Sequence, residues 1–183
     1  TAVISERKVS IVPKPGHEAD VQRNPYIAYN CVRLVADSKV AVVTNGSQTD
    51  PIAEKIDMGM PVRDALALSS LALDYEKDDY NTPRVSAVVD TRDSSGWLAI
   101  VRHDGLEVRR MPLTTGTLFY VATYEENSVL DGYGDAFDAA SAEHACDFML
   151  GGGVFAEREK PVTAVAAMAM PNGFQLFAKD AVQ

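Results

Sequence analysis

A series of short segments rich in β-branched residues most constrains the fold of this chain. They occupy residues 8–12, 27–35, 40–44, 84–90, 97–102, 106–111, 118–124, 163–170 and 173–179. Segments of this length and composition are typical of β-strands. Several are joined by stretches that favour chain reversal, at 36–38, 93–96 and 103–105, and the Pro-Asn-Gly of 171–173 is a strong hairpin signal. The pattern therefore predicts consecutive antiparallel hairpins.

Helical periodicity is confined to three regions. The clearest covers 61–74, where apolar residues lie nearly all round the predicted helix, so we expect it to be sandwiched against a sheet. A second covers 141–150 and ends at the glycines of 151–153, and a short third covers 50–56. Helices beside runs of antiparallel strands predict an α+β layered domain. The 183 residues suit a single domain, 1–183.

The charge of the chain limits its partners. A net charge of −9 argues against binding to a nucleic-acid backbone, although a few arginines and backbone amides could still form a pocket for an anionic small molecule. No apolar run approaches the ~20 residues that cross a bilayer, and the N-terminus lacks a secretion signal. We therefore expect a soluble cytoplasmic protein with no membrane partner. Cys31 and Cys146 adjoin no cysteine or histidine cluster, which predicts neither a disulfide nor a zinc site.

The segment 23–33, RNPYIAYNCVR, is the densest candidate for a functional site. Strand alternation places four of its side chains on one face: Ile27, Tyr29, Cys31 and Arg33. A phenol and a guanidinium would then point the same way. The pattern is also that of a core tyrosine with a satisfied hydroxyl and an arginine that covers a sheet edge.

Two loops supply further candidates. The segment 74–84, DYEKDDYNTPR, places acids, amides and an arginine directly after the apolar helix. Acids at a helix C-terminus are electrostatically unfavourable, which favours a functional role over simple capping. The segment 44–50, TNGSQTD, combines a turn with hydroxyls and amides before a predicted helix, where backbone N–H groups could bind an anion. The same residues also suit an ordinary turn and N-cap.

In this order the three blocks resemble the archaeal-type IMP cyclohydrolase family. The resemblance covers nearly the whole chain and rests on four motifs, NPYIAYNC, NGS-x-TD, MG-x-x-x-RDAL and LDYEKDDYNTPR. It implies closure of 5-formamidoimidazole-4-carboxamide ribonucleotide (FAICAR) to IMP and water, the last step of purine biosynthesis, with no metal and no organic cofactor. It also implies a four-layer αββα fold like that of the N-terminal-nucleophile hydrolases, and a homo-oligomer, with a tetramer favoured.

The resemblance also assigns roles to individual residues. Tyr29 and Glu76 are implied in proton transfer: the carboxylate would orient or deprotonate the carboxamide and the phenol would donate to the formyl oxygen, or the roles could be exchanged. Substrate binding is implied for Asn30, Arg33, Asn45, Arg63, Asp64, Asn81 and Arg84. Of these, Asn30 and Asn81 are expected at the carboxamide or base edge, and the arginines at the 5′-phosphate.

The start of the chain differs from that of the family. Family members begin earlier, with a strand that includes an arginine of the site, whereas this chain opens at Thr1 within the usual pattern, so the first strand of the family could be lacking.

Two other readings of the sequence stay open. A free N-terminal threonine could serve as the nucleophile of an amidohydrolase. Alternatively, the chain could be a purine-nucleotide-binding module without catalysis. The three scattered histidines, His17, His103 and His144, are expected to have no role.

Overall fold

A seven-stranded antiparallel sheet forms the centre of the computed structural model, which describes residues 1–125, 127–129 and 135–182. Its strands follow one another in chain order. They are β1 (Ala2–Ser5), β2 (Lys8–Ile11), β3 (Tyr29–Val35), β4 (Val40–Thr44), β5 (Arg84–Asp90), β6 (Ser95–Arg102) and β7 (Gly105–Met111). Two antiparallel pairs complete the described strands: β8 (Thr117–Leu118) with β9 (Asp135–Ala136), and β10 (Thr163–Met170) with β11 (Gly173–Asp180).

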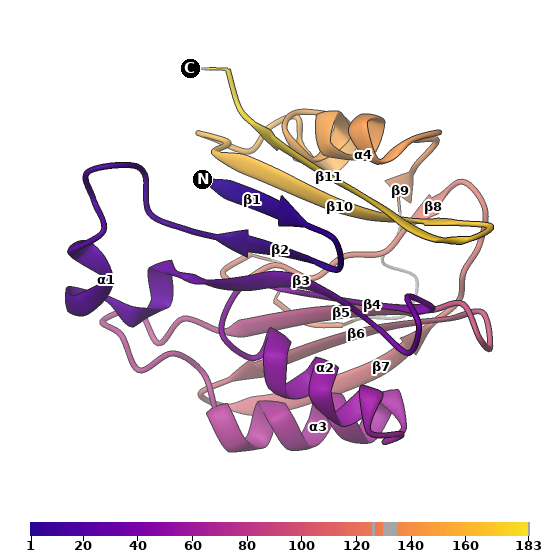
Figure 1. Ribbon diagram of the computed structural model, residues 1–183, viewed down its shortest axis with the longest axis horizontal. Coiled ribbons are helices and arrows are strands. Elements are labelled where there is room, and N and C mark those ends of the chain that lie inside the picture. The colour runs from indigo at the N-terminus through magenta and orange to yellow at the C-terminus, as the bar shows by residue number, and fades with distance from the viewer. Residues whose placement is uncertain (126, 130–134, 183) are drawn as a thin grey trace.

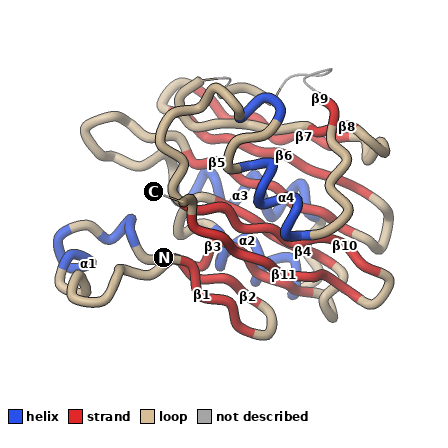
Figure 2. The backbone as a smooth tube through the Cα atoms, turned by 90° about the horizontal axis from the view of Figure 1, so that it is seen from above, coloured by secondary structure: helices blue, strands red, loops and turns tan. Residues whose placement is uncertain are grey.

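The helices lie on both sides of these strands. They are α1 (Asp20–Arg23), α2 (Thr49–Asp57), α3 (Val62–Leu73) and α4 (Ala142–Met149), with short 3-10 turns at Pro25–Ile27 and Gly153–Phe155. In Figure 1, α2 and α3 cover one face of the large sheet, while the β10–β11 hairpin lies on the other face with α4 outside it. Figure 2 shows the hairpin crossing over the strands of the large sheet. The α+β prediction is therefore confirmed. No helix among the described residues is both long and apolar enough to cross a membrane.

Most predicted elements are confirmed, and the exceptions have two causes. The expected strand at 118–124 is wrong, because only Thr117–Leu118 pairs as a strand. Phe119 and Val121 instead pack as loop residues against a core cluster that contains Ile100. Their apolar character reflects burial in the core, and not hydrogen bonding to a neighbouring strand. The short elements β1, β9 and α1 were not expected, since so few residues carry no readable period.

The large sheet is buried on both faces. In β4, Val40 and Val42 join the cluster formed with α2 and α3, whereas Ala41 joins the cluster beneath the hairpin. The helix α3 was expected to be enclosed because it is apolar nearly all round. Only one of its sides packs on the sheet, and Leu71 on the other side is 64% exposed.

A β-bulge in β3 overturns the expected alternation of its side chains. Val9 pairs with Val32 but Ser10 pairs with Asn30, so Cys31 is an extra residue in β3. Beyond a bulge the side chains change faces. The prediction that Tyr29 and Arg33 share a face is therefore wrong. Arg33 and Asn30 both reach Asp50 of α2, while Tyr29 packs against the cluster beneath the hairpin.

Candidate active site

A buried ion pair lies at the end of the large sheet where β5 begins. The Nη1 of Arg84 donates to Oε1 of Glu76 at 2.9 Å, and the two side chains are only 6% and 10% exposed. The Nε of Arg84 donates to the carbonyl of Asp74, the residue that ends α3 with a φ of 58°. The ring of Tyr26 lies 5.6 Å from the guanidinium. Arg84 is thus held on several sides inside the protein.

The loop between β4 and α2 completes this cluster. The Oδ1 of Asn45 accepts from the backbone N–H of Val85 at 3.0 Å and from Nε2 of Gln48 at 3.1 Å. A Cβ on Gly46 would lie 2.7 Å from Nη1 of Arg84 and 2.7 Å from Oε1 of Gln48. The position therefore accepts no side chain without a shift in these groups. Sequence analysis recognised the turn but did not single out Gly46 or Gln48.

The electrostatic environment of Glu76 opposes its ionisation. Burial raises the pKa of the carboxyl, the charge of Arg84 counteracts part of this rise, and the charge of Asp78 adds to it. Asp78 itself holds the loop by accepting from the backbone N–H groups of Tyr80 and Thr82, and the Thr82 bonds lower the pKa of Asp78. A buried carboxyl with a raised pKa is suited to proton transfer near neutral pH.

Tyr29 lies at the start of β3 and is half-buried. Burial raises the pKa of its phenol, and the charges of Cys31 and Glu76 add to this rise. Tyr29 and Glu76 are 47 positions apart in the sequence, but the fold brings them within electrostatic reach of each other.

Asn30 and Arg33 converge on a residue that sequence analysis did not select. The Nδ2 of Asn30 donates to both carboxylate oxygens of Asp50, at 3.0 and 2.9 Å, and Nη1 of Arg33 donates to Oδ1 at 2.6 Å. Asp50 lies in the first turn of α2, where a carboxylate is electrostatically favoured. The TD of the NGS-x-TD motif was the available signal for it.

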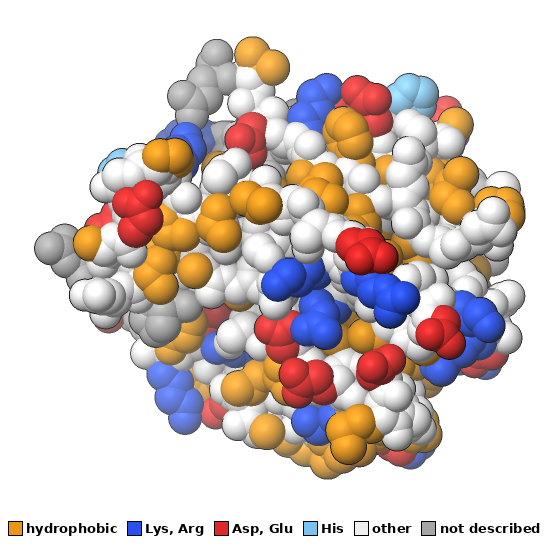
Figure 3. Space-filling view, viewed as in Figure 1, with side chains coloured by type: hydrophobic (Ala, Val, Ile, Leu, Met, Phe, Trp, Pro, Cys, Tyr) orange, Lys and Arg blue, Asp and Glu red, His pale blue; other side chains and the backbone are white. Residues whose placement is uncertain are grey.

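A hollow of about 500 Å³ lies beside Arg33 and is lined by two further basic side chains, Arg7 and Lys8, and by two acidic ones, Glu6 and Asp57. Lys8 pairs with Arg33 across β2 and β3, so both side chains lie on the same face of the sheet. Figure 3 shows basic side chains gathered next to acidic ones over the region of β2 and β3.

Asn81 lies in the loop after Glu76, in a left-handed conformation with a φ of 51°. Asparagine tolerates this conformation better than most residues. It lines a polar hollow of about 300 Å³ together with Arg102, His103 and Tyr124. His103 was expected to have no role, and its ring packs edge-on against Tyr75 of the same loop.

Arg63 and Asp64 lie away from the other predicted residues. They pair with each other at 2.7 Å in the first turn of α3, and the side chain of Arg63 is 70% exposed. The length of α3, at 1.5 Å per residue, separates them from its Glu76 end by roughly 16 Å. Within this chain, the structure does not bring them to the Glu76–Arg84 cluster.

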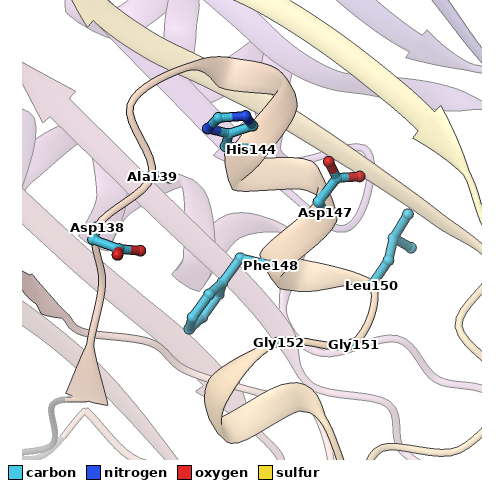
Figure 4. A pocket seen from close by; sticks show the side chains of 8 residues that line it. All are labelled: Asp138, Ala139, His144, Asp147, Phe148, Leu150, Gly151 and Gly152. Carbon is cyan, nitrogen blue, oxygen red and sulfur yellow. The ribbon is translucent and has the colours of Figure 1, made fainter.

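A larger hollow, of about 530 Å³, lies beside α4 and contains none of the predicted residues. Figure 4 shows Phe148 and Asp147 of α4 at its edge, with Asp138 across from them. No arginine or lysine is among the described residues that line this hollow to offset the two carboxylates, which argues against nucleotide binding there.

Among the described residues, no group of three or more His, Cys, Asp or Glu side chains could hold a metal ion. Cys31 and Cys146 are free and buried, and burial raises the pKa of each thiol to about 11. The ammonium group of Thr1 donates to the carbonyl of Val12 at 2.8 Å, in continuation of the β1–β2 pairing.

Residues 1–173 match the family model described as IMP cyclohydrolase-like protein. A protein named IMP cyclohydrolase from Methanosphaera stadtmanae is 46% identical over 166 residues, covering 91% of this chain and 78% of the relative. Relatives of the same name from Methanocella arvoryzae and Methanococcus maripaludis strain C7 are 44% and 42% identical, over 94% and 95% of this chain and 80% and 82% of the relatives. This chain therefore belongs to the IMP cyclohydrolase-like family.

Proposed function

We propose that this protein converts FAICAR to IMP and water. The observation that carries the proposal is the buried carboxyl of Glu76, held by Arg84 and electrostatically coupled to the phenol of Tyr29. Relatives that bear the name IMP cyclohydrolase align over most of the chain and support the same reaction.

The substrate supplies much of the rate enhancement, because both reacting groups are carried by one imidazole ring. The carboxamide nitrogen attacks the formyl carbon, a new C–N bond forms, and the formyl oxygen leaves as water. Glu76 takes a proton from the carboxamide nitrogen as Tyr29 donates one to the formyl oxygen, which becomes a hydroxyl on the new ring. When the C–O bond breaks, Glu76 returns its proton to this hydroxyl, which leaves as water, and the phenolate takes the proton of the formamide nitrogen as the C=N bond forms. A raised pKa makes the carboxylate of Glu76 a stronger base for the amide proton. A raised pKa also keeps the phenol of Tyr29 protonated, so that it can donate to the formyl oxygen. The reaction has no change in oxidation state.

The arginines differ in the role that their surroundings support. Arg84 is committed to Glu76 and the Asp74 carbonyl, so we assign it to holding the base and not to the phosphate. Arg33 donates to Asp50 through Nη1, and it also lines an open hollow in which three basic side chains outnumber two acidic ones, so it is the arginine that we assign to the 5′-phosphate.

The amide side chains also differ in the role that their surroundings support. Asn81, which lines a polar hollow, would bind the carboxamide or base edge. Asn30 was expected there too, but its amide donates to Asp50 and accepts from Ser10, so we assign it to holding Asp50. Asn45 would hold the β4–α2 loop in place.

The architecture and assembly complete the proposal. The order of α2 and α3, the large sheet, the β10–β11 hairpin and α4 supports a four-layer αββα domain like that of the N-terminal-nucleophile hydrolases, formed by residues 1–183 (Figure 1). The exposed Leu68 and Leu71 on α3 support a homo-oligomer, for which we propose a tetramer in the cytoplasm. Arg63 and Asp64 border this apolar face, so they would serve a site across a subunit boundary. Light scattering that gives a monomer mass would exclude the assembly.

Incubation with FAICAR tests the function, because the ultraviolet spectrum changes as the second ring forms. Glu76→Gln and Tyr29→Phe should each lower turnover by about 10²–10⁴-fold while the fold is retained. Glu143→Gln, an exposed change on α4, is the matched control and should have no effect. Wild-type rates in both site variants would remove the assignment. Nucleotide binding without turnover by the unmodified protein would indicate the binding module, and amidase turnover would indicate the Thr1 mechanism.

A further inference from the structure

Gln48 connects parts of the site that lie far apart in the sequence. Its side chain is 1% exposed. Its Nε2 donates to Oδ1 of Asn45 and to the carbonyl of Val85, both at 3.1 Å, and its Oε1 accepts from Nη1 of Arg84 at 3.2 Å. The same nitrogen of Arg84 donates to Glu76. Gln48 therefore links the β4–α2 loop, the start of β5 and the carboxylate of Glu76 in one network.

The partners of Gln48 allow only one orientation of its amide. Two of them, Asn45 Oδ1 and the Val85 carbonyl, are acceptors, and the third, the guanidinium of Arg84, is a donor without acceptor capacity. A flipped amide would set N–H against N–H and oxygen against oxygen. Glycine at position 46 leaves the room that both side chains occupy, since a Cβ there would lie 2.7 Å from Gln48 and from Arg84. The amide therefore fixes where Arg84 lies.

We propose that Gln48 is a positioning residue, which fixes Arg84 against Glu76 and so holds the carboxylate in the orientation that proton transfer requires. This inference rests on the proposed function, because that function assigns the proton transfer to Glu76. In this proposal Gln48 does not act on the reacting atoms directly. Its effect on the reaction passes through Arg84.

A double-mutant cycle separates positioning from a general contribution to folding. Gln48→Met keeps a side chain of similar length but removes all three hydrogen bonds. A displaced carboxylate should lower kcat by about 10–100-fold with little change in KM. In the Glu76→Gln background the same change should lower kcat no further, because the group that Gln48 positions is already removed. Gln175→Met, an exposed change on β11, is the matched control.

If Gln48→Met fails to fold, a second variant tests the positioning role of Gln48. Gln48→Glu keeps an acceptor for Arg84 but places a second carboxylate in the network. The charged and titratable groups that already act on Glu76 are Arg84 from β5, Asp78 from its own loop and Tyr29 from β3. An added negative charge should move the acidic limb of the pH–rate profile to higher pH.

The outcomes distinguish this inference from the proposed function. Loss of kcat that disappears in the Glu76→Gln background, or a shifted acidic limb in Gln48→Glu, supports the positioning role. Equal losses in both backgrounds, wild-type kcat in folded Gln48→Met, or an unshifted limb in Gln48→Glu, overturns it. Wild-type turnover in Glu76→Gln would instead overturn the assignment of Glu76 in the proposed function.

Discussion

Replacing Gly46 by alanine probes the closest packing in the candidate site. The new Cβ would lie 2.7 Å from Nη1 of Arg84, 2.7 Å from Oε1 of Gln48 and 3.2 Å from Oε1 of Glu76. Ordinary carbon contacts need more than 3.4 Å. All three side chains are buried, and Arg84 donates to both Gln48 and Glu76, so none can move without weakening the network.

The expected loss follows from overpacking. An extra methyl group in a close-packed interior costs about 1–3 kcal/mol of unfolding free energy. For a domain of this size, each kcal/mol lowers the Tm by about 2–4 °C. Displacement of Glu76 should also lower turnover, since the network orients the carboxylate.

Gly151→Ala is the matched control, because a Cβ there would meet no atom within 4 Å. The φ of both glycines lies outside the left-handed region, so neither change strains the backbone. Each gains about 0.4–1 kcal/mol from the reduced freedom of the unfolded chain, and the comparison cancels this gain. Calorimetry and the ultraviolet assay measure both effects. Equal Tm and equal turnover in the two variants would refute the reasoning about packing.

Two further predictions concern the ion pair. Arg84→Met should lower the unfolding free energy by about 3–5 kcal/mol, because it leaves the Glu76 carboxylate buried without a partner; denaturant titration measures this, and a loss below about 1 kcal/mol contradicts it. The raised pKa of Glu76 predicts that its contribution to stability is complete below the ordinary value of 4.5 and is lost as the pH rises through the folded-state value. The stability of Glu76→Gln relative to the unmodified protein should therefore increase with pH above 4.5, and a difference that stays constant would argue against the shift.

The local sequence pattern was sufficient to predict most of the helices and strands, but not every contact that they make. The hairpins and the helices at 49–57, 62–73 and 142–149 follow from turn residues and periodicity, both of which depend on neighbours in the chain. The segment 118–124 has the composition of a strand but lacks a partner to pair with along its length. Strand pairing is a property of two segments, and composition describes only one.

The same limit applies to the candidate site. The motifs pointed to Tyr29, Glu76 and Arg84 as members of one site, and the fold brings these residues to one end of the sheet. The motifs could not assign Arg84 to Glu76 in preference to a phosphate, because that depends on the depth at which the guanidinium is buried. Gln48 and Asp50 were missed for a similar reason, since Arg84 and Val85 reach Gln48 from β5, and Asn30 and Arg33 reach Asp50 from β3.

The sequence by itself determined the α+β class, the order of the hairpins and the residue types available for chemistry, because these depend on short-range pattern and on motif identity. Only the tertiary structure decided which side chains meet. One extra residue at Cys31 turns Tyr29 away from Arg33, and one glycine admits Gln48 and Arg84 to the same space. Both effects arise from contacts between distant segments, where a displacement of a single residue or a single methyl group changes the outcome.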